Sequence, residues 1–241
     1  RPRRHFRFAT RHARRVAAAC GQSAGAPKSE STLDLAVIGN GRTAALVEPS
    51  GRIVWWCLPR YDGDPAFCRL LAGEEEKGFT DVVLHGQTAS RSEYMRNTAI
   101  VVTELADGNG GAVRITDFAP RFSNYGRIFR PPQLVRIVEP ISGMPRITIL
   151  VRTTHRYGVP VGRRSSGSNH IRYWRDEVPV RLTTDAPLAH VENEASFVLT
   201  RPVHMVLGMD EPFEGALEST CREFCRRTRD YWMDWVRRLA F

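Results

Sequence analysis

Residues 33–72 read LDLAVIGNGRTAALVEPSGRIVWWCLPRYDGDPAFCRLLA and set the pattern for the rest of the chain. Short apolar runs at 35–38, 44–47 and 52–57 predict three strands, because each is bounded by residues that favour turns. Glu48-Pro49-Ser50-Gly51 supplies the turn before the third strand. These short strands, joined by tight turns, predict antiparallel pairing at the start of the fold.

The same β-rich pattern continues after this segment. Alternation of apolar and polar residues, as in 146–153, is typical of a half-buried strand. The other expected strands are 81–84, 90–94, 99–104, 112–117, 133–140, 171–174, 180–183, 189–192, 196–200 and 203–208. Residues 157–169 are rich in Gly, Ser and Arg and predict a long exposed loop. Many short strands without intervening helices predict an all-β fold, an antiparallel sandwich spanning residues 31–213.

The net charge of +9 is concentrated at one end of the chain. Residues 1–30 hold seven arginines and Lys28 against Glu30 alone, a net charge of +7. The remaining residues hold 27 basic and 25 acidic side chains, which argues against nucleic-acid binding by the body of the protein. The composition of residues 1–30, here called the arm, predicts a disordered Arg-rich extension. Its composition also fits an organellar transit peptide or a tail that binds polyphosphate or nucleic acid.

Composition also bears on compartment and cofactors. No apolar run approaches the roughly 20 residues of a membrane-spanning helix, so a membrane partner is not expected. The five cysteines include no close Cys-x-x-Cys pair, and Cys221 and Cys225 alone do not make a zinc site. We therefore expect a reduced, cytoplasmic protein with no cofactor and no metal.

Residues 39–44, GNGRTA, match a glycine-rich dinucleotide-binding pattern that follows a strand. That pattern requires a long helix immediately afterwards, whose N-terminus holds the pyrophosphate. Here Pro49 and Gly51 interrupt the next element, which has a strand pattern. We therefore interpret the two glycines as a tight turn between strands.

Asp62 and Asp64 lie on the loop after the third strand, beside Arg60 and Tyr61. A calcium loop would need further oxygen ligands at regular spacing, and the residues after Asp64 supply none. Two interpretations remain open. The aspartates hold a turn through side-chain bonds to the backbone, or the loop reaches a sugar whose hydroxyls they bind.

Residues 214–241, EGALESTCREFCRRTRDYWMDWVRRLAF, change the pattern. Apolar side chains at steps of three or four predict a long amphipathic helix, with early acids and late arginines as the helix dipole prefers. The helix either packs back on the sandwich or leads into a further domain.

The chain closely resembles the N-terminal region of bacterial glycoside hydrolase family 15, the glucoamylase and trehalase-like group. The resemblance covers residues 31–241 and is most specific in 33–71, in ITDFAPR (115–121) and in TRDYWMDW (228–235). It implies an antiparallel β supersandwich followed by a linker helix, 214–241, that leads to an (α/α)6 catalytic barrel. The chain ends about where that barrel would begin.

The resemblance implies inverting hydrolysis of α-glucosidic bonds in trehalose or maltooligosaccharides. Inversion needs a general acid and a general base, and the family places both glutamates in the barrel. We therefore nominate no catalytic residue in this chain, and give Asp62 and Asp64 as its substrate-binding candidates. The expected partners are the barrel and the α-glucoside substrate. The alternatives are a stand-alone carbohydrate-binding or regulatory β module and a non-functional gene fragment.

Overall fold

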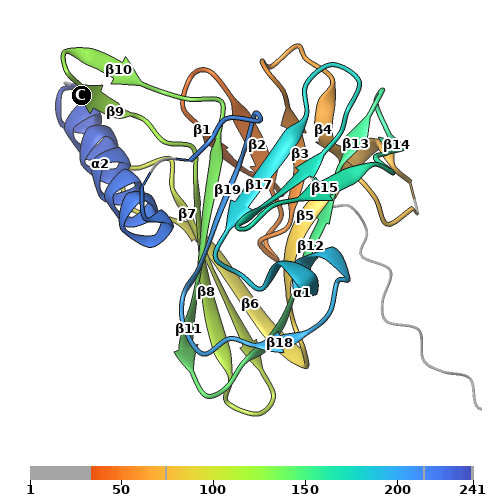
Figure 1. The fold of residues 1–241 in the computed structure, drawn as a ribbon. Coiled ribbons are helices and arrows are strands. Elements are labelled where there is room, and N and C mark those ends of the chain that lie inside the picture. Colours follow the sequence, from red (N-terminus) through yellow and green to blue (C-terminus); the bar gives the residue numbers. More distant parts are fainter. Residues whose placement is uncertain (1–33, 74, 214, 240–241) are drawn as a thin grey trace, which may run out of the picture. The chain divides into compact units, whose positions relative to one another are not determined.

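The computed structural model describes residues 34–73, 75–213 and 215–239 (Figure 1). The arm predicted over residues 1–30 lies outside the described residues. All strand pairings in the described part are antiparallel, and two large sheets pack face to face. The predicted all-β antiparallel sandwich with a C-terminal helix is therefore confirmed.

The first sheet has seven strands in the order β1-β2-β3-β5-β12-β18, with β4 also paired to β3. The three strands predicted from the opening segment are β1, β2 and β3. The bounds are β1 Ala36–Gly39, β2 Ala44–Val47, β3 Ile53–Cys57, β4 Pro65–Cys68, β5 Phe79–Leu84, β12 Arg146–Arg152 and β18 Phe197–Val198.

The second sheet has eight strands in the order β15-β16-β17-β19-β11-β8-β7-β6. Their bounds are β6 Gln87–Tyr94, β7 Val101–Asp107, β8 Ala112–Phe118, β11 Leu134–Ser142, β15 Arg164–Ser166, β16 His170–Tyr173, β17 Val180–Thr184 and β19 Val203–Gly208. Two hairpins stand outside the large sheets. They are β9 (Phe122–Asn124) with β10 (Arg127–Phe129), and β13 (Thr154–His155) with β14 (Val159–Pro160).

Two local predictions were wrong. Residues 189–192 belong to a helix, α1 (Leu188–Glu192), and not to a strand. Residues 157–169, predicted as loop, contain β14 and β15. The segment after the aspartate loop, for which no element was predicted, forms β4 and a 3₁₀ turn, Arg69–Leu71. Such short elements are set by pairing with distant neighbours, which a local pattern does not reveal.

The space between the sheets is filled by aliphatic and aromatic side chains from both, including Trp56, Ile115 and Ile149. One ion pair lies within this apolar interior. The guanidinium of Arg136 on β11 binds the carboxylate of Asp117 on β8, with Nε to Oδ1 at 2.7 Å and Nη2 to Oδ2 at 3.0 Å. Arg136 Nη2 also donates to the carbonyl of Gly51 at 2.6 Å. Because Gly51 is in the β2–β3 turn, this contact joins the two sheets.

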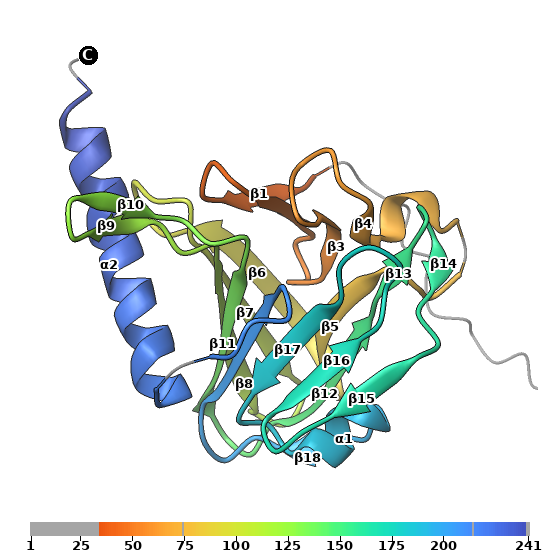
Figure 2. The ribbon, with the colours of Figure 1, turned by 45° about the horizontal axis from the view of Figure 1, so that its top comes forward.

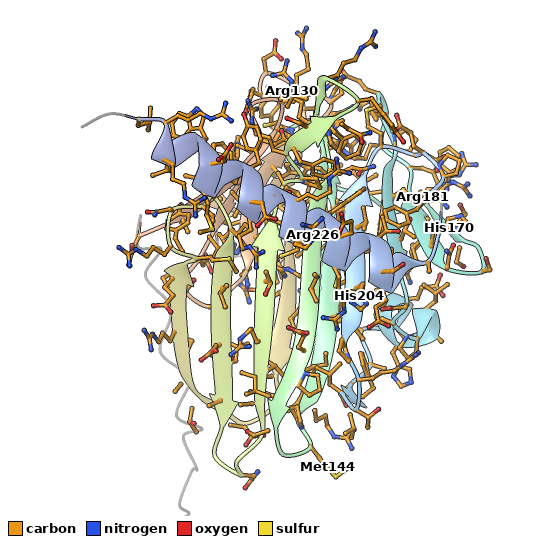
Figure 3. All side chains as sticks on the ribbon, turned by 90° about the vertical axis from the view of Figure 1, so that its left-hand side faces the viewer. Arg130, Met144, His170, Arg181, His204 and Arg226 are labelled. Carbon is orange, nitrogen blue, oxygen red and sulfur yellow. The ribbon has the colours of Figure 1, made fainter. Side chains whose placement is uncertain are left out.

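The C-terminal helix α2 (Leu217–Arg237) packs on the outer face of the second sheet. Figure 3 shows it lying across those strands near one end of the sheet. A second apolar cluster fills the contact, with Cys221 and Phe224 of the helix against Phe118, Ile137 and Val206 of the strands. The helix therefore does pack back on the sandwich, as one of the two predicted alternatives requires.

Burial of Cys221 leads to a testable expectation. Desolvation raises the pKa of this thiol to about 12, so roughly one molecule in ten thousand carries the reactive thiolate at pH 8. We expect iodoacetamide to leave Cys221 unmodified in the native protein and to alkylate it after urea unfolding, as read by peptide mass spectrometry. Rapid alkylation without urea would show that α2 leaves the sheet under native conditions.

Candidate functional site

The two candidate aspartates lie on one loop but in different surroundings. Asp62 is at the surface, with a side chain 70% exposed, and forms a two-point contact with Arg60. The hydrogen bond from Arg60 lowers the pKa of Asp62. Beside it, Tyr61 is exposed and its hydroxyl donates to the carbonyl of Thr43 at 3.3 Å. Asp62, Arg60 and Tyr61 therefore present polar groups to solvent.

Asp64 points into the protein, and its side chain is only 17% exposed. Its carboxylate accepts from the backbone N–H groups of Arg156 at 2.7 Å and Tyr157 at 2.9 Å. It also pairs with Arg175, at 2.8 Å from Nη2 to Oδ2. Both backbone donors have positive φ angles, 47° and 56°, in the turn between β13 and β14. Asp64 thus holds that hairpin against the β3–β4 loop, and the structure does not bring its carboxylate together with that of Asp62.

Replacing Asp62 is expected to have little effect on the stability of the protein. Because Asp62 contacts only solvent and the equally exposed Arg60, we expect Asp62→Ala to leave the thermal unfolding midpoint unchanged within error. Differential scanning fluorimetry of the purified chain measures this. A clear fall in the midpoint would mean that the Arg60–Asp62 pair helps to hold the loop.

The glycine-rich segment 39–44 forms a turn, as predicted. The side chain of Asn40 is fully buried. Its amide donates to the carbonyls of Pro120 at 3.0 Å and Pro131 at 2.7 Å, while its oxygen accepts from the N–H groups of Arg42 and Thr43. Since β2 follows instead of a helix, this turn has no helix N-terminus to hold a pyrophosphate.

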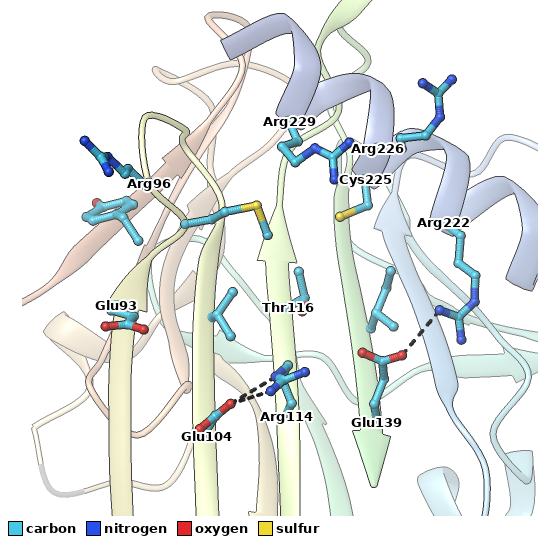
Figure 4. A pocket seen from close by; sticks show the side chains of 14 residues that line it. Glu93, Arg96, Glu104, Arg114, Thr116, Glu139, Arg222, Cys225, Arg226 and Arg229 are labelled. Atoms are coloured by element: carbon cyan, nitrogen blue, oxygen red, sulfur yellow. Dashed lines mark hydrogen bonds and ion pairs between the residues drawn. The ribbon is translucent and has the colours of Figure 1, made fainter. Parts of the chain in front are cut away.

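A groove of about 710 Å³ lies between α2 and the outer face of β6, β7, β8 and β11 (Figure 4). The strands contribute Val102, Thr116 and Ile137 to its lining, the residue after β6 contributes Met95, and α2 contributes Cys225. Charged side chains make up much of the remaining lining. The groove thus combines apolar and charged side chains.

The carboxylates of the groove are engaged by arginines. Glu104 pairs with Arg114 at 2.8 Å and Glu139 with Arg222 at 3.3 Å. Glu93 pairs with Arg91, also at 2.8 Å. An inverting glycosidase needs one carboxyl group kept protonated and one free to activate water. The described residues of the groove show no such pair, because each of its three glutamates is paired with an arginine.

Neither a metal centre nor a membrane segment is found in the described ranges. No three His, Cys, Asp or Glu side chains there come together as a possible metal site. No helix of residues 34–73, 75–213 and 215–239 is both long and apolar enough to cross a bilayer.

Three arginines that organise the structure were not singled out from the sequence. Arg136 lies at an inward position of β11, between the core residues Leu134 and Val138. Alternation along the strand is a signal that could have found it. Arg175 and Arg121 lie outside regular strands. Nothing in the local pattern sets them apart from the many other arginines.

Comparison with known proteins gives one family and several relatives. The family described as "Trehalase-like, N-terminal" matches residues 24–184, more than half of the chain. A trehalase of Thermoplasma volcanium is 30% identical over 154 residues, which cover 63% of this chain and 24% of that protein. A trehalase of Thermoplasma acidophilum is 33% identical over 115 residues, 46% of this chain and 19% of that protein. Trehalase 2 of Sulfolobus acidocaldarius is 30% identical over 88 residues, 36% of this chain and 14% of that protein.

The matched segments thus span about a quarter or less of these relatives. No solved structure matches the chain.

Proposed function

This chain belongs to the trehalase-like N-terminal domain family, and from that premise we propose that it is the N-terminal module of an α-glucoside hydrolase. The observation that carries the proposal is the family match over residues 24–184. The relatives named trehalase extend far beyond the matched segment. We place catalysis in that further polypeptide, an (α/α)6 barrel of the family 15 type that hydrolyses trehalose or maltooligosaccharides with inversion.

The arrangement of charges in the module supports a non-catalytic role. The groove carboxylates Glu93, Glu104 and Glu139 are all paired with arginines. Asp64 is engaged by two backbone N–H groups and Arg175. In this proposal the module positions the catalytic polypeptide and does not itself cleave the glycosidic bond. The free cysteines 57, 68, 221 and 225 support a reducing, cytoplasmic location.

Glucose release from trehalose and maltose tests the proposal. The purified chain is assayed alone and as a fusion to the part of Thermoplasma volcanium trehalase that lies beyond the aligned segment. We expect no release by the chain alone and release by the fusion, at a rate above that of the added part without the module. Release by the chain alone would overturn the proposal, and so would a fusion no more active than the added part.

The surface aspartate remains part of this proposal. We propose that Asp62, with Arg60 and Tyr61 beside it, faces the sugar-binding end of the enzyme, and that Asp64 supports the loop from inside. In the fusion, Asp62→Ala is expected to raise KM for trehalose while the thermal midpoint stays unchanged. Unchanged KM and unchanged kcat would remove Asp62 from the substrate-binding residues.

A second candidate function is favoured by the groove. Its apolar side chains, planar arginine and carboxylate groups and the half-exposed ring of Tyr94 suit a saccharide. A stand-alone carbohydrate-binding module would bind trehalose or maltooligosaccharides without the barrel. Isothermal titration calorimetry of the chain with these sugars decides between the two, because the leading proposal expects no measurable heat from the module alone.

A further inference from the structure

One side of α2 changes from buried to exposed along its length. Cys221 and Thr228 are fully buried, and the hydroxyl of Thr228 accepts the N–H of Arg121 at 3.1 Å. Trp235 follows Thr228 by seven residues and so lies on the same side of the helix, and Leu239 follows just beyond the end of the helix. Trp235 is nevertheless 47% exposed and Leu239 is 39% exposed. The apolar stripe therefore continues beyond the surface that covers its first half.

The shape of the module explains this change. Seven residues advance a helix by about 10 Å, and Figure 2 shows α2 running past the β9–β10 hairpin and away from the strands. Tyr231, Trp232 and Trp235 make edge-to-face contacts with one another there, with ring centroids 5.4 and 5.8 Å apart. We call Tyr231, Trp232, Trp235 and Leu239 the terminal aromatic patch.

Two polar groups at the base of the patch lack acceptors. Nε1 of Trp232 and Nε of Arg121 are buried and have no hydrogen-bond partner among the described residues. The Arg121 guanidinium lies 5.0 Å from the ring of Tyr231 and 5.6 Å from that of Trp232, and it also contacts the carbonyl of Asn40. Buried N–H groups are nearly always paired in folded proteins. Both donors are closed off from solvent, so they mark a gap in the packing beneath the patch and not a polar contact of its surface.

We propose that the terminal aromatic patch is the docking surface for the polypeptide that follows this module in trehalases. This inference rests on the proposed function. The matched segments make up only 24% and 19% of two relatives, and the patch lies at the C-terminal end of α2, where the strands leave this side of the helix uncovered. Four side chains are far fewer than the roughly 20–30 residues a side of a stable interface between separate molecules. They suffice for a tethered partner, whose effective concentration is in the millimolar range.

Hydrogen exchange in the fusion to the Thermoplasma volcanium polypeptide tests this docking surface. We expect amide exchange over residues 231–239 to slow at least tenfold in the fusion relative to the chain alone. Trp235→Ser should abolish the slowing, and because Trp235 is half exposed, the substituted chain should keep the circular dichroism of the parent. Met144→Ser is the matched control, since Met144 is a more exposed apolar side chain in the β11–β12 turn, away from α2 (Figure 3).

The outcomes separate this inference from the proposed function. In one outcome the fusion hydrolyses trehalose, but its residues 231–239 exchange as fast as in the chain alone. This result overturns the docking surface and leaves the proposed function standing. Slowed exchange without hydrolysis supports the docking surface and counts against the proposed function. If the chain alone forms dimers in sedimentation velocity that Trp235→Ser dissociates, the occupant is a second copy and the proposal is overturned.

Discussion

Replacing Arg136 with alanine is expected to lower the free energy of unfolding by about 3–5 kcal/mol, because it leaves a buried carboxylate without its partner. The side chains of Arg136 and Asp117 are 1% and 0% exposed. The substitution also removes the donor to the Gly51 carbonyl, the contact that joins the two sheets. Urea denaturation followed by tryptophan fluorescence measures the loss.

The pH dependence of this loss has a definite sign. Burial raises the pKa of Asp117, and removing Arg136 takes away the positive charge that opposes this rise. A carboxyl group whose pKa is raised by folding destabilises the native state as the pH rises through that pKa. The difference between the parent and Arg136→Ala should therefore be largest at neutral pH and shrink toward pH 4. A difference that grows on acidification would contradict the uncompensated charge as its cause.

Two control variants make the test specific. Arg114→Ala breaks the exposed pair with Glu104 on the same sheet and is expected to cost less than about 1 kcal/mol. The double variant Arg136→Leu with Asp117→Leu removes both buried charges together. It should recover most of the stability lost by Arg136→Ala, because an apolar pair needs no charge compensation.

Asp64→Ala is expected to lower the free energy of unfolding by about 2–4 kcal/mol, because it leaves the buried Arg175 without its charged partner and removes the acceptor of two backbone N–H groups. Arg175 has a side chain only 2% exposed. Urea denaturation gives the magnitude, and faster hydrogen exchange in the β13–β14 hairpin would locate the effect. Asp62→Ala, two residues away, is the matched control. Equal effects of the two substitutions would contradict the structural role given to Asp64.

The parts of the fold that could be predicted from sequence are those with strong local patterns. The run at 44–47 and the helical stripe from Leu217 onward were recognisable, because burial on one side repeats with a fixed period. The helix α1 was read as a strand because five residues are too few to separate the two periods. The hairpin of β9 and β10 was missed because it is held by tertiary contacts, with Phe122 and Phe129 packed against Phe224 of α2.

Less of the candidate site could be predicted. The loop with Asp62 and Asp64 was found from its composition, but the sequence gives no sign that Asp64 turns inward to Arg175, 111 residues away. The groove beside α2 combines side chains from four strands and the helix. Its existence depends on how α2 crosses the sheet, which no local pattern encodes.

The position of α2 has a consequence for how the protein is made. Phe118, Val135, Ile137 and Val206 lie on the face that α2 covers, and all of them are synthesised before residues 217–228 leave the ribosome. Nascent chains with the eight strands complete therefore present this apolar face to their surroundings until the helix emerges. Such surfaces bind chaperones or other nascent chains. Slow translation through the codons for α2 is thus expected to lower the yield of soluble protein. Co-expression of a chaperone that binds nascent chains is expected to restore that yield.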